Sequence, residues 1–287
     1  MKIGSVATCK RVSKEEFLRE YKAKEIPVVI QNLTEDWPAR EKWSMEYFES
    51  LIGDKEVKLY DSEPSKDKKL QHAAETTMAL REYFSLLRKG EKNLRMFFFN
   101  ILQEAPLLKD DFRFPDIGLK LFKRLPVLFV GGAGAKVQMH FDIDYADILL
   151  CHFGGEKRVR LFPPSATKDI YHVPFSFSSL HSIDYDNPDY EKYPALEKLE
   201  GQEVSLKHGD VLYIPPGWWH YIVYEDIGFS MALRAFPRGG KNLLKMLQNL
   251  LLIRSVEGMM RLLLGQKWND RNERVAIIRT NKRLEKR

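Results

Sequence analysis

Two histidines and one aspartate stand out because side chains of these types at this spacing could bind a metal ion. His140 and Asp142 are two residues apart in a stretch with strand character, and residues i and i+2 of a strand point to the same face. His220 follows 80 positions after His140. Two imidazoles and one carboxylate form the facial triad that binds non-heme Fe(II) and leaves positions open, although Zn, Ni or Mn also accept such ligands.

The residues around these candidate ligands match the two halves of a cupin metal signature. The first half is Gly134, His140 and Asp142, and the second half is Gly209, Pro215, Gly217 and His220. Glycine and proline make tight turns, which would aim the ligands inward from adjacent strands of a small barrel. A single histidine is usually structural, but the two half-signatures in this order favour a metal site.

A mainly β architecture is predicted for the region that holds the signature. Short strand-like stretches separated by Gly and Pro turns favour a β-sandwich or barrel over a parallel α/β sheet. These stretches are 95–100, 128–131, 136–141, 146–153, 158–162, 202–206, 211–214, 220–223 and 229–236. The segment 165–201 interrupts them, and we expect a loop of this length to be functional.

Helical elements are expected on both sides of this β region. Ser13 and Glu16 form a capping-box pattern that begins a helix. Further elements expected before the β region are a strand at 26–30, a helix at 44–52, a strand at 57–60, a charged loop at 61–69 and a helix at 77–89. Helices are also expected at 241–264 and 268–287. We therefore divide the chain into a catalytic domain, 1–237, with its core barrel at about 95–237, and a helical extension, 238–287.

Charge is distributed unevenly along the 287 residues, whose formal net charge is +6. Residues 238–287 contain 13 Lys and Arg and 4 Asp and Glu, a net of +9, so the rest of the chain is slightly acidic. No nucleic-acid-binding motif accompanies this basic extension, which we interpret as a solvated or packing helix. No stretch predicts a membrane span or a signal peptide, and two cysteines give no disulfide framework, so we expect a cytoplasmic protein.

Residues 25–237 resemble the cupin-like JmjC family of Fe(II)/2-oxoglutarate dioxygenases, and within it the asparaginyl hydroxylase that inhibits hypoxia-inducible factor. The resemblance is carried by Gly155-Glu-Lys-Arg-Val-Arg-Leu-Phe-Pro-Pro164, by the string from Gly209 to His220, and by shorter matches at 27–30 and 186–190. It implies a double-stranded β-helix with flanking helices. It also implies Fe(II) held by the three candidate ligands, 2-oxoglutarate as cosubstrate, and O₂.

The same resemblance implies residues for the cosubstrate. Lys157 matches the family lysine that pairs with the distal carboxylate of 2-oxoglutarate, and a buried dianion does need a cation partner. Arg234 could offer a second carboxylate contact, and Asn100 is a further candidate. The chain departs from the family where a threonine and a tyrosine are expected, because Val137 and Phe97 stand there.

The resulting hypothesis is an Fe(II)- and 2-oxoglutarate-dependent hydroxylase of a protein or peptide side chain. One alternative is a small-molecule oxygenase with the same chemistry, and another is a metal-binding cupin that does not use 2-oxoglutarate. Demethylation of methyl-lysine is a lesser alternative. The apolar face of the helix at 241–264 needs a partner, and the resemblance suggests a homodimer formed through the C-terminal helices.

Overall fold

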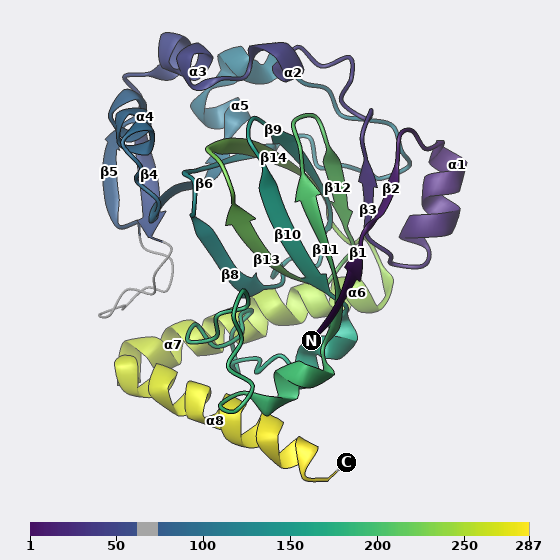
Figure 1. Cartoon of the computed structure of the whole chain (residues 1–287), viewed down its shortest axis with the longest axis vertical. Helices are drawn as coiled ribbons and strands as arrows, with labels where there is room; N and C mark the ends of the chain where they lie inside the picture. Colours follow the sequence, from purple (N-terminus) through teal and green to yellow (C-terminus); the bar gives the residue numbers. More distant parts are fainter. Residues whose placement is uncertain (62–73, 287) are drawn as a thin grey trace.

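Two β-sheets face each other and form the barrel (Figure 1). The structure is a computed structural model that describes residues 1–61 and 74–286. The smaller sheet has the order β1 (Lys2–Ser5), β11 (Glu200–Leu206), β10 (Lys157–Phe162), β13 (Trp219–Tyr224) and β8 (Lys136–His140). The larger sheet has the order β2 (Ala7–Cys9), β3 (Val28–Ile30), β12 (Val211–Ile214), β9 (Asp147–Phe153), β14 (Gly228–Ala235), β7 (Val127–Gly131), β6 (Leu94–Asn100), β4 (Glu56–Asp61) and β5 (Thr76–Ala79). The mainly β, cupin-type prediction is confirmed.

Side chains that point inward from both sheets fill part of the barrel. Because successive residues of a strand alternate between faces, every second residue contributes. The resulting apolar cluster includes Val127, Ile148, Leu150, Val159, Leu161, Leu212, Ile214 and Ala232. Polar side chains on the same inward faces, at other levels of the barrel, are therefore separated from bulk water by this packing.

Helices cover the outer face of the larger sheet, among them α3 (Met45–Ile52) and α4 (Leu80–Arg88) (Figure 1). The predicted helix start at Ser13 is confirmed, since its side chain accepts a hydrogen bond from the Glu16 amide. The predicted helix at 77–89 is wrong at its beginning. Residues Thr76–Ala79 pair with β4 instead, so the helix begins only at Leu80. Most of the charged loop expected at 61–69 lies outside the described residues.

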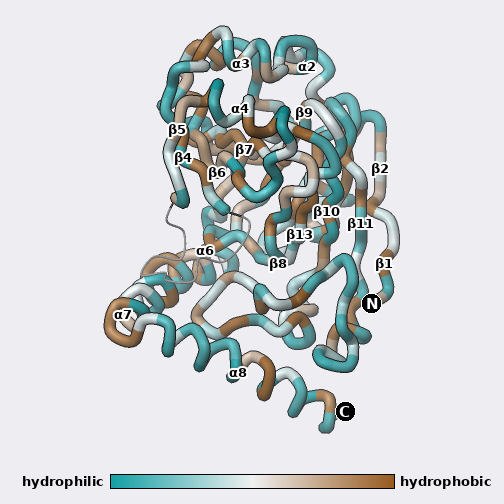
Figure 2. Tube along the Cα trace, turned by 60° about the vertical axis from the view of Figure 1, so that its left-hand side comes forward, coloured by the Kyte–Doolittle hydropathy of each residue, from teal (hydrophilic) through white to brown (hydrophobic). Residues whose placement is uncertain are grey.

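The predicted C-terminal helices form a layer below the ends of β8 and β13 (Figure 1). They are α6 (Gly240–Leu247), which continues through π-helical turns into α7 (Arg254–Leu264), and α8 (Gln266–Leu284). Figure 2 shows hydrophobic residues concentrated on α7 and around its end, whereas α8 is largely hydrophilic. Among the described residues, no helix is both long and apolar enough to cross a membrane.

Candidate metal centre and cosubstrate pocket

The structure brings His140, Asp142 and His220 together inside the barrel. His140 ends β8 and lies directly opposite His220 of β13, with ring centroids 4.1 Å apart. Asp142 follows β8, and its Oδ2 lies 4.0 Å from Nε2 of His220. Each residue offers one donor atom within 4.8 Å of the other two. A single ion could therefore contact all three.

Backbone carbonyls orient both imidazoles. Nδ1–H of His140 donates to the carbonyl oxygen of Gln138 at 2.8 Å, and Nδ1–H of His220 donates to that of Trp218 at 3.2 Å. We assign these tautomers because a carbonyl can only accept. The lone pair of each Nε2 is then free for a metal, the arrangement by which hydrogen bonds to the opposite ring nitrogen position metal-binding histidines.

The electrostatic surroundings keep the three donors deprotonated. Burial lowers the pKa of both imidazoles, and that of His140 falls to about 3. Burial alone would raise the pKa of Asp142, but the guanidinium of Arg234 outweighs burial and lowers the pKa to about 2. Two neutral imidazoles and one carboxylate form a donor set that fits Fe(II).

Arg234, on β14, bridges two carboxylates instead of projecting alone into the barrel. Its Nη2 lies 3.4 Å from Oδ1 of Asp142, and its Nη1 donates to Oδ2 of Asp144 at 3.0 Å. Arg234 is 6% exposed, so little water screens these pairs. The contact orients the carboxylate of Asp142 and leaves its Oδ2 directed to the histidines. The Nε of Arg234 is buried and has no hydrogen-bond partner among the described residues.

Lys157 lies deeper in the barrel, on β10. Strand pairing sets Leu161 opposite His220 and Lys157 opposite Tyr224, so Lys157 projects on the side of His220 but four residues further along β10. It is 1% exposed; its Nζ donates to Oγ of Ser230 and lies 3.9 Å from the centroid of the Tyr224 ring. Burial lowers the pKa of Lys157 well below its ordinary value.

The other predicted cosubstrate residue, Asn100, caps a helix. Its Oδ1 accepts from the Leu102 amide at 3.1 Å, and its Nδ2 donates to the Arg124 carbonyl at 3.2 Å. Both ends of the amide are therefore already engaged, and the structure gives its predicted role no support. Phe97, where a tyrosine was expected, packs on Phe129 with ring centroids 5.6 Å apart.

Sequence reasoning missed Arg95, a cation on β6. Its Nε is buried without a hydrogen-bond partner among the described residues, and its charge adds to the effect of burial in lowering the pKa values of Lys157 and His140. Arg95 therefore shares the electrostatic environment of the pocket. No motif accompanies Arg95, and only the strand pairing reveals its neighbours.

The long segment 165–201 directly supports the candidate ligands. It pairs with the end of β8 through a bridge between His140 and Ser178 and through backbone hydrogen bonds from Phe141 to Phe177 and from Ser179 to Met139, each 3.0 Å. The segment is therefore an added strand-like edge beside the metal-binding motif, and it is packed, not an open loop.

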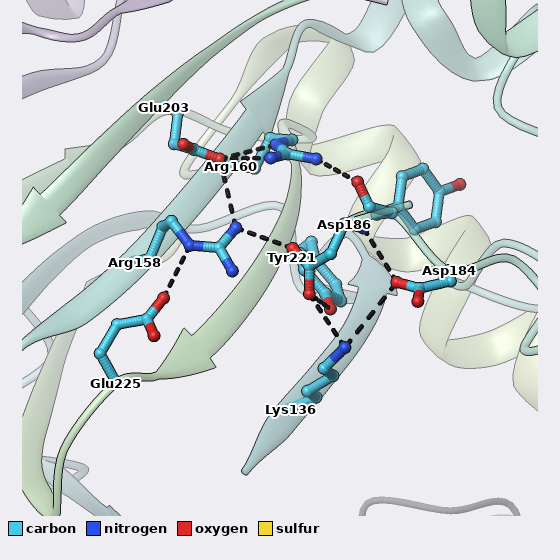
Figure 3. A network of polar contacts seen from close by, with 9 residues as sticks. Lys136, Arg158, Arg160, Asp184, Asp186, Glu203, Tyr221 and Glu225 are labelled. Atoms are coloured by element: carbon cyan, nitrogen blue, oxygen red, sulfur yellow. Dashed lines mark hydrogen bonds and ion pairs between the residues drawn. The ribbon is translucent and has the colours of Figure 1, made fainter. Parts of the chain in front are cut away.

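A polar network anchors the same segment to the outer face of the smaller sheet (Figure 3). Asp186 accepts from Arg158 at 2.8 Å, from the Tyr221 hydroxyl at 2.7 Å, and pairs with Lys136 at 2.9 Å. These three cationic and hydroxyl donors outweigh the effect of burial and lower the pKa of Asp186 to about 2. An ionised Asp186 thus holds the segment against strands that carry the site.

The C-terminal helices reach the loop after Asp142. Asn249 Nδ2 donates to the carbonyl oxygen of Ile143 at 3.0 Å, and Nζ of Lys245 lies 4.9 Å from the centroid of the Tyr145 ring. The extension therefore contacts the segment that carries one candidate ligand.

Comparison with known proteins agrees with this geometry. The profile of the cupin-like domain family matches residues 13–236. The chain is 30% identical to tRNA wybutosine-synthesizing protein 5 of Gallus gallus, over 78% of this chain and 74% of the relative. It is 31% identical to lysine-specific demethylase JMJ30 of Arabidopsis thaliana, over 78% of this chain and 54% of the relative. It is 29% identical to Jumonji C domain-containing protein 5 of Drosophila melanogaster, over 72% of this chain and 53% of the relative.

The chain belongs to the cupin-like JmjC family. Proteins of this family are typically Fe(II)- and 2-oxoglutarate-dependent oxygenases, so the class expected from the sequence agrees with the family.

Proposed function

We propose that this protein is an Fe(II)- and 2-oxoglutarate-dependent oxygenase that hydroxylates a protein or peptide side chain. The observation that carries the proposal is the convergence of two neutral imidazoles and the ionised Asp142 inside a barrel that also buries Lys157. Bound Fe(II), with 2-oxoglutarate and O₂, supplies the oxidising chemistry.

The chain's own residues bind and orient the reactants. His140, Asp142 and His220 would hold the metal, and Lys157 would pair with the distal carboxylate of the cosubstrate. Arg234 would keep Asp142 ionised and oriented. The apolar cluster between the sheets excludes water from the reacting groups.

Metal-dependent turnover of 2-oxoglutarate tests this proposal. Anaerobic addition of Fe(II) and 2-oxoglutarate should give a weak visible absorption band, and a panel of peptides in air should yield succinate and a product heavier by one oxygen atom. His140→Ala should abolish both signals. His208→Ala is the matched control, because His208 is exposed, accepts from the Gly154 amide and packs against Phe153. Absence of both signals in the wild-type protein would refute the proposal.

A nucleoside in RNA is a second candidate substrate. The relatives named tRNA wybutosine-synthesizing protein 5 and the net charge of +9 in residues 238–287 favour it. Two results would favour RNA over a peptide as the substrate. The protein would bind a tRNA pool with an affinity that falls steeply as salt is added, and a digest of that tRNA would contain oxidised nucleosides. A small-molecule substrate is the third outcome, and it would produce succinate with neither polymer.

A metal-binding cupin without 2-oxoglutarate is the remaining alternative, and Val137 and Phe97 motivate it. Metal binding without any binding of 2-oxoglutarate would select it. We further propose that the chain forms a homodimer through its C-terminal helices and acts in the cytoplasm. Exposed Leu244, Leu251 and Leu262, which are 69%, 69% and 78% exposed, support the dimer.

A further inference from the structure

Arg95 and Lys157 lie at the two ends of a short chain of contacts inside the barrel. Arg95 pairs with Gly131 across β6 and β7. Gly131 has no side chain, and a Cβ there would lie 2.9 Å from the Tyr224 ring, so the ring packs directly on its backbone. The same ring also lies beside Lys157, whose Nζ is 3.9 Å from the ring centroid.

Neither cation has a carboxylate partner in the part of the chain that the structure describes. Lys157 contacts a hydroxyl and an aromatic ring, both neutral. Arg95 leaves Nε without a hydrogen bond, and its Nη2 reaches only the backbone oxygen of Asp61, at 3.4 Å.

Lys157 is buried, and Arg95 is half-buried with a buried Nε, so these two like charges favour an anion between them. Burial lowers the pKa of Arg95 more than Tyr224, Tyr83 and Asp61 raise it. The charge of Arg95 adds to the effect of burial in lowering the pKa of Lys157. Removing charge from water is costly unless a counter-charge compensates it. Asp61 acts on Arg95 from a distance, but no carboxylate of the described residues forms an ion pair with either cation.

We propose that Arg95 and Lys157 together form a two-cation pocket that binds one carboxylate group of a dicarboxylate ligand. The identity of the ligand rests on the proposed function: the carboxylate is the distal one of 2-oxoglutarate, and the keto acid end of the same molecule is directed to the metal ligands. The planar guanidinium of Arg95 would donate two parallel hydrogen bonds, and Lys157 would contribute a point charge. Arg95 would thus provide polar contacts that Phe97 and Val137 cannot.

The test compares two ligands that differ only at the distal end. Metal-loaded protein is titrated anaerobically in a calorimeter with 2-oxoglutarate or with 2-oxopentanoate, which ends in a methyl group. Arg95→Met should weaken 2-oxoglutarate binding by about 10- to 100-fold, the range expected when a hydrogen bond to a charged group is lost. Binding of 2-oxopentanoate should change less than about twofold, and Arg95→Lys should recover part of the loss.

Controls separate a local effect from misfolding. Arg113→Met removes an exposed arginine that pairs with Asp36, and it should bind both ligands like the wild-type protein. The thermal unfolding midpoint of each variant is measured in parallel. Equal weakening of both ligands by Arg95→Met, or no weakening of either, would overturn the two-cation pocket.

A second titration shows whether the two-cation pocket or the proposed function has failed. Glutarate has the same distal carboxylate but lacks the keto group. If the wild-type protein binds glutarate in an Arg95-dependent way but does not bind 2-oxoglutarate more tightly when metal is present, the cosubstrate role fails and the two-cation pocket stands. If neither dicarboxylate depends on Arg95, the pocket is wrong whatever the reaction.

Discussion

The guanidinium of Arg234 lies 3.4 Å from the carboxylate of Asp142 and holds Asp144 with its other nitrogen. The sequence predicted Arg234 as a contact for the cosubstrate, a role that stays a prediction. The geometry adds a different role, because this arginine orients a candidate metal ligand. Partners that orient metal ligands typically change metal affinity 10- to 100-fold when they are removed.

Arg234→Met should therefore weaken metal binding by roughly 10- to 100-fold. The substitution leaves the buried carboxylate of Asp142 without its strongest counter-charge and free to rotate. Calorimetric titration with Mn(II), which does not oxidise in air as readily as Fe(II), measures the change. Asp144→Asn is the paired variant and should have a smaller effect, because it keeps the contact between Arg234 and Asp142. Unchanged affinity in Arg234→Met would show that the contact does not orient the ligand.

The metal-binding motif could be predicted from sequence because its information is local. His140 and Asp142 share a face through strand alternation, and Gly209 to His220 carries its own turn residues. The pairing of His140 with His220 then follows once both are placed on neighbouring strands of a small barrel.

The remaining features depend on pairing between distant segments. Arg95 enters the pocket only through its register with Gly131, which no local pattern specifies. Residues Thr76–Ala79 directly precede a helix and were predicted to belong to it, but they pair with β4 and form a strand instead. The side chain of an asparagine can bind a carboxylate or cap a helix. Asn100 caps a helix in this structure.

Anchoring of the segment 165–201 should affect the metal site from outside the barrel. Asp186→Asn weakens three contacts, to Arg158, Lys136 and Tyr221, while it preserves the size of the side chain. We expect a loss of about 1–2 kcal/mol in the free energy of unfolding and faster exchange of the Phe141 amide, which bonds to Phe177. Urea unfolding measures the change in free energy, and hydrogen exchange read by mass spectrometry measures exchange at the Phe141 amide.

Asp116→Asn provides the comparison for this experiment, because Asp116 forms an exposed pair with Lys14. It should leave exchange at the Phe141 amide unchanged. If Asp186→Asn behaves in the same way, the network in Figure 3 stabilises only the surface.

Stability of the metal-free protein should fall as the pH drops below about 6.5. Burial, with the charge of Lys157, lowers the pKa of His152 to about 3. The unfolded chain, with an ordinary pKa of about 6.5, then binds more protons than the folded chain between these values. The stability that neutral His152 contributes is present above the upper value and is lost as the pH falls toward the lower one, at up to about 1.4 kcal/mol per pH unit.

Urea unfolding at pH 7.5 and pH 5 measures this slope. The groups that face His152 include Ser230, the backbone of Gly155 and Phe229, and the side chains of Lys157 and His208. His152→Gln removes the titrating group, so its stability should depend less on pH than that of the wild-type protein, whatever its stability at pH 7.5. The same slope in both proteins would assign the acid sensitivity to other groups.

The exposed apolar residues of α6, α7 and the π-helical turns between them should form a contact between two copies of the chain. Leu251 and Leu262 are 69% and 78% exposed, and a soluble protein rarely leaves such side chains grouped on one surface. Replacing both with Ser should convert a dimer into a monomer, measured by light scattering after size exclusion. Leu107→Ser is the matched control, since Leu107 is 67% exposed but lies outside the extension. A monomeric wild-type protein at micromolar concentration would contradict the dimer. The apolar surface would then bind a different partner. Because Asn249 contacts the loop after Asp142, that partner would bind close to this loop.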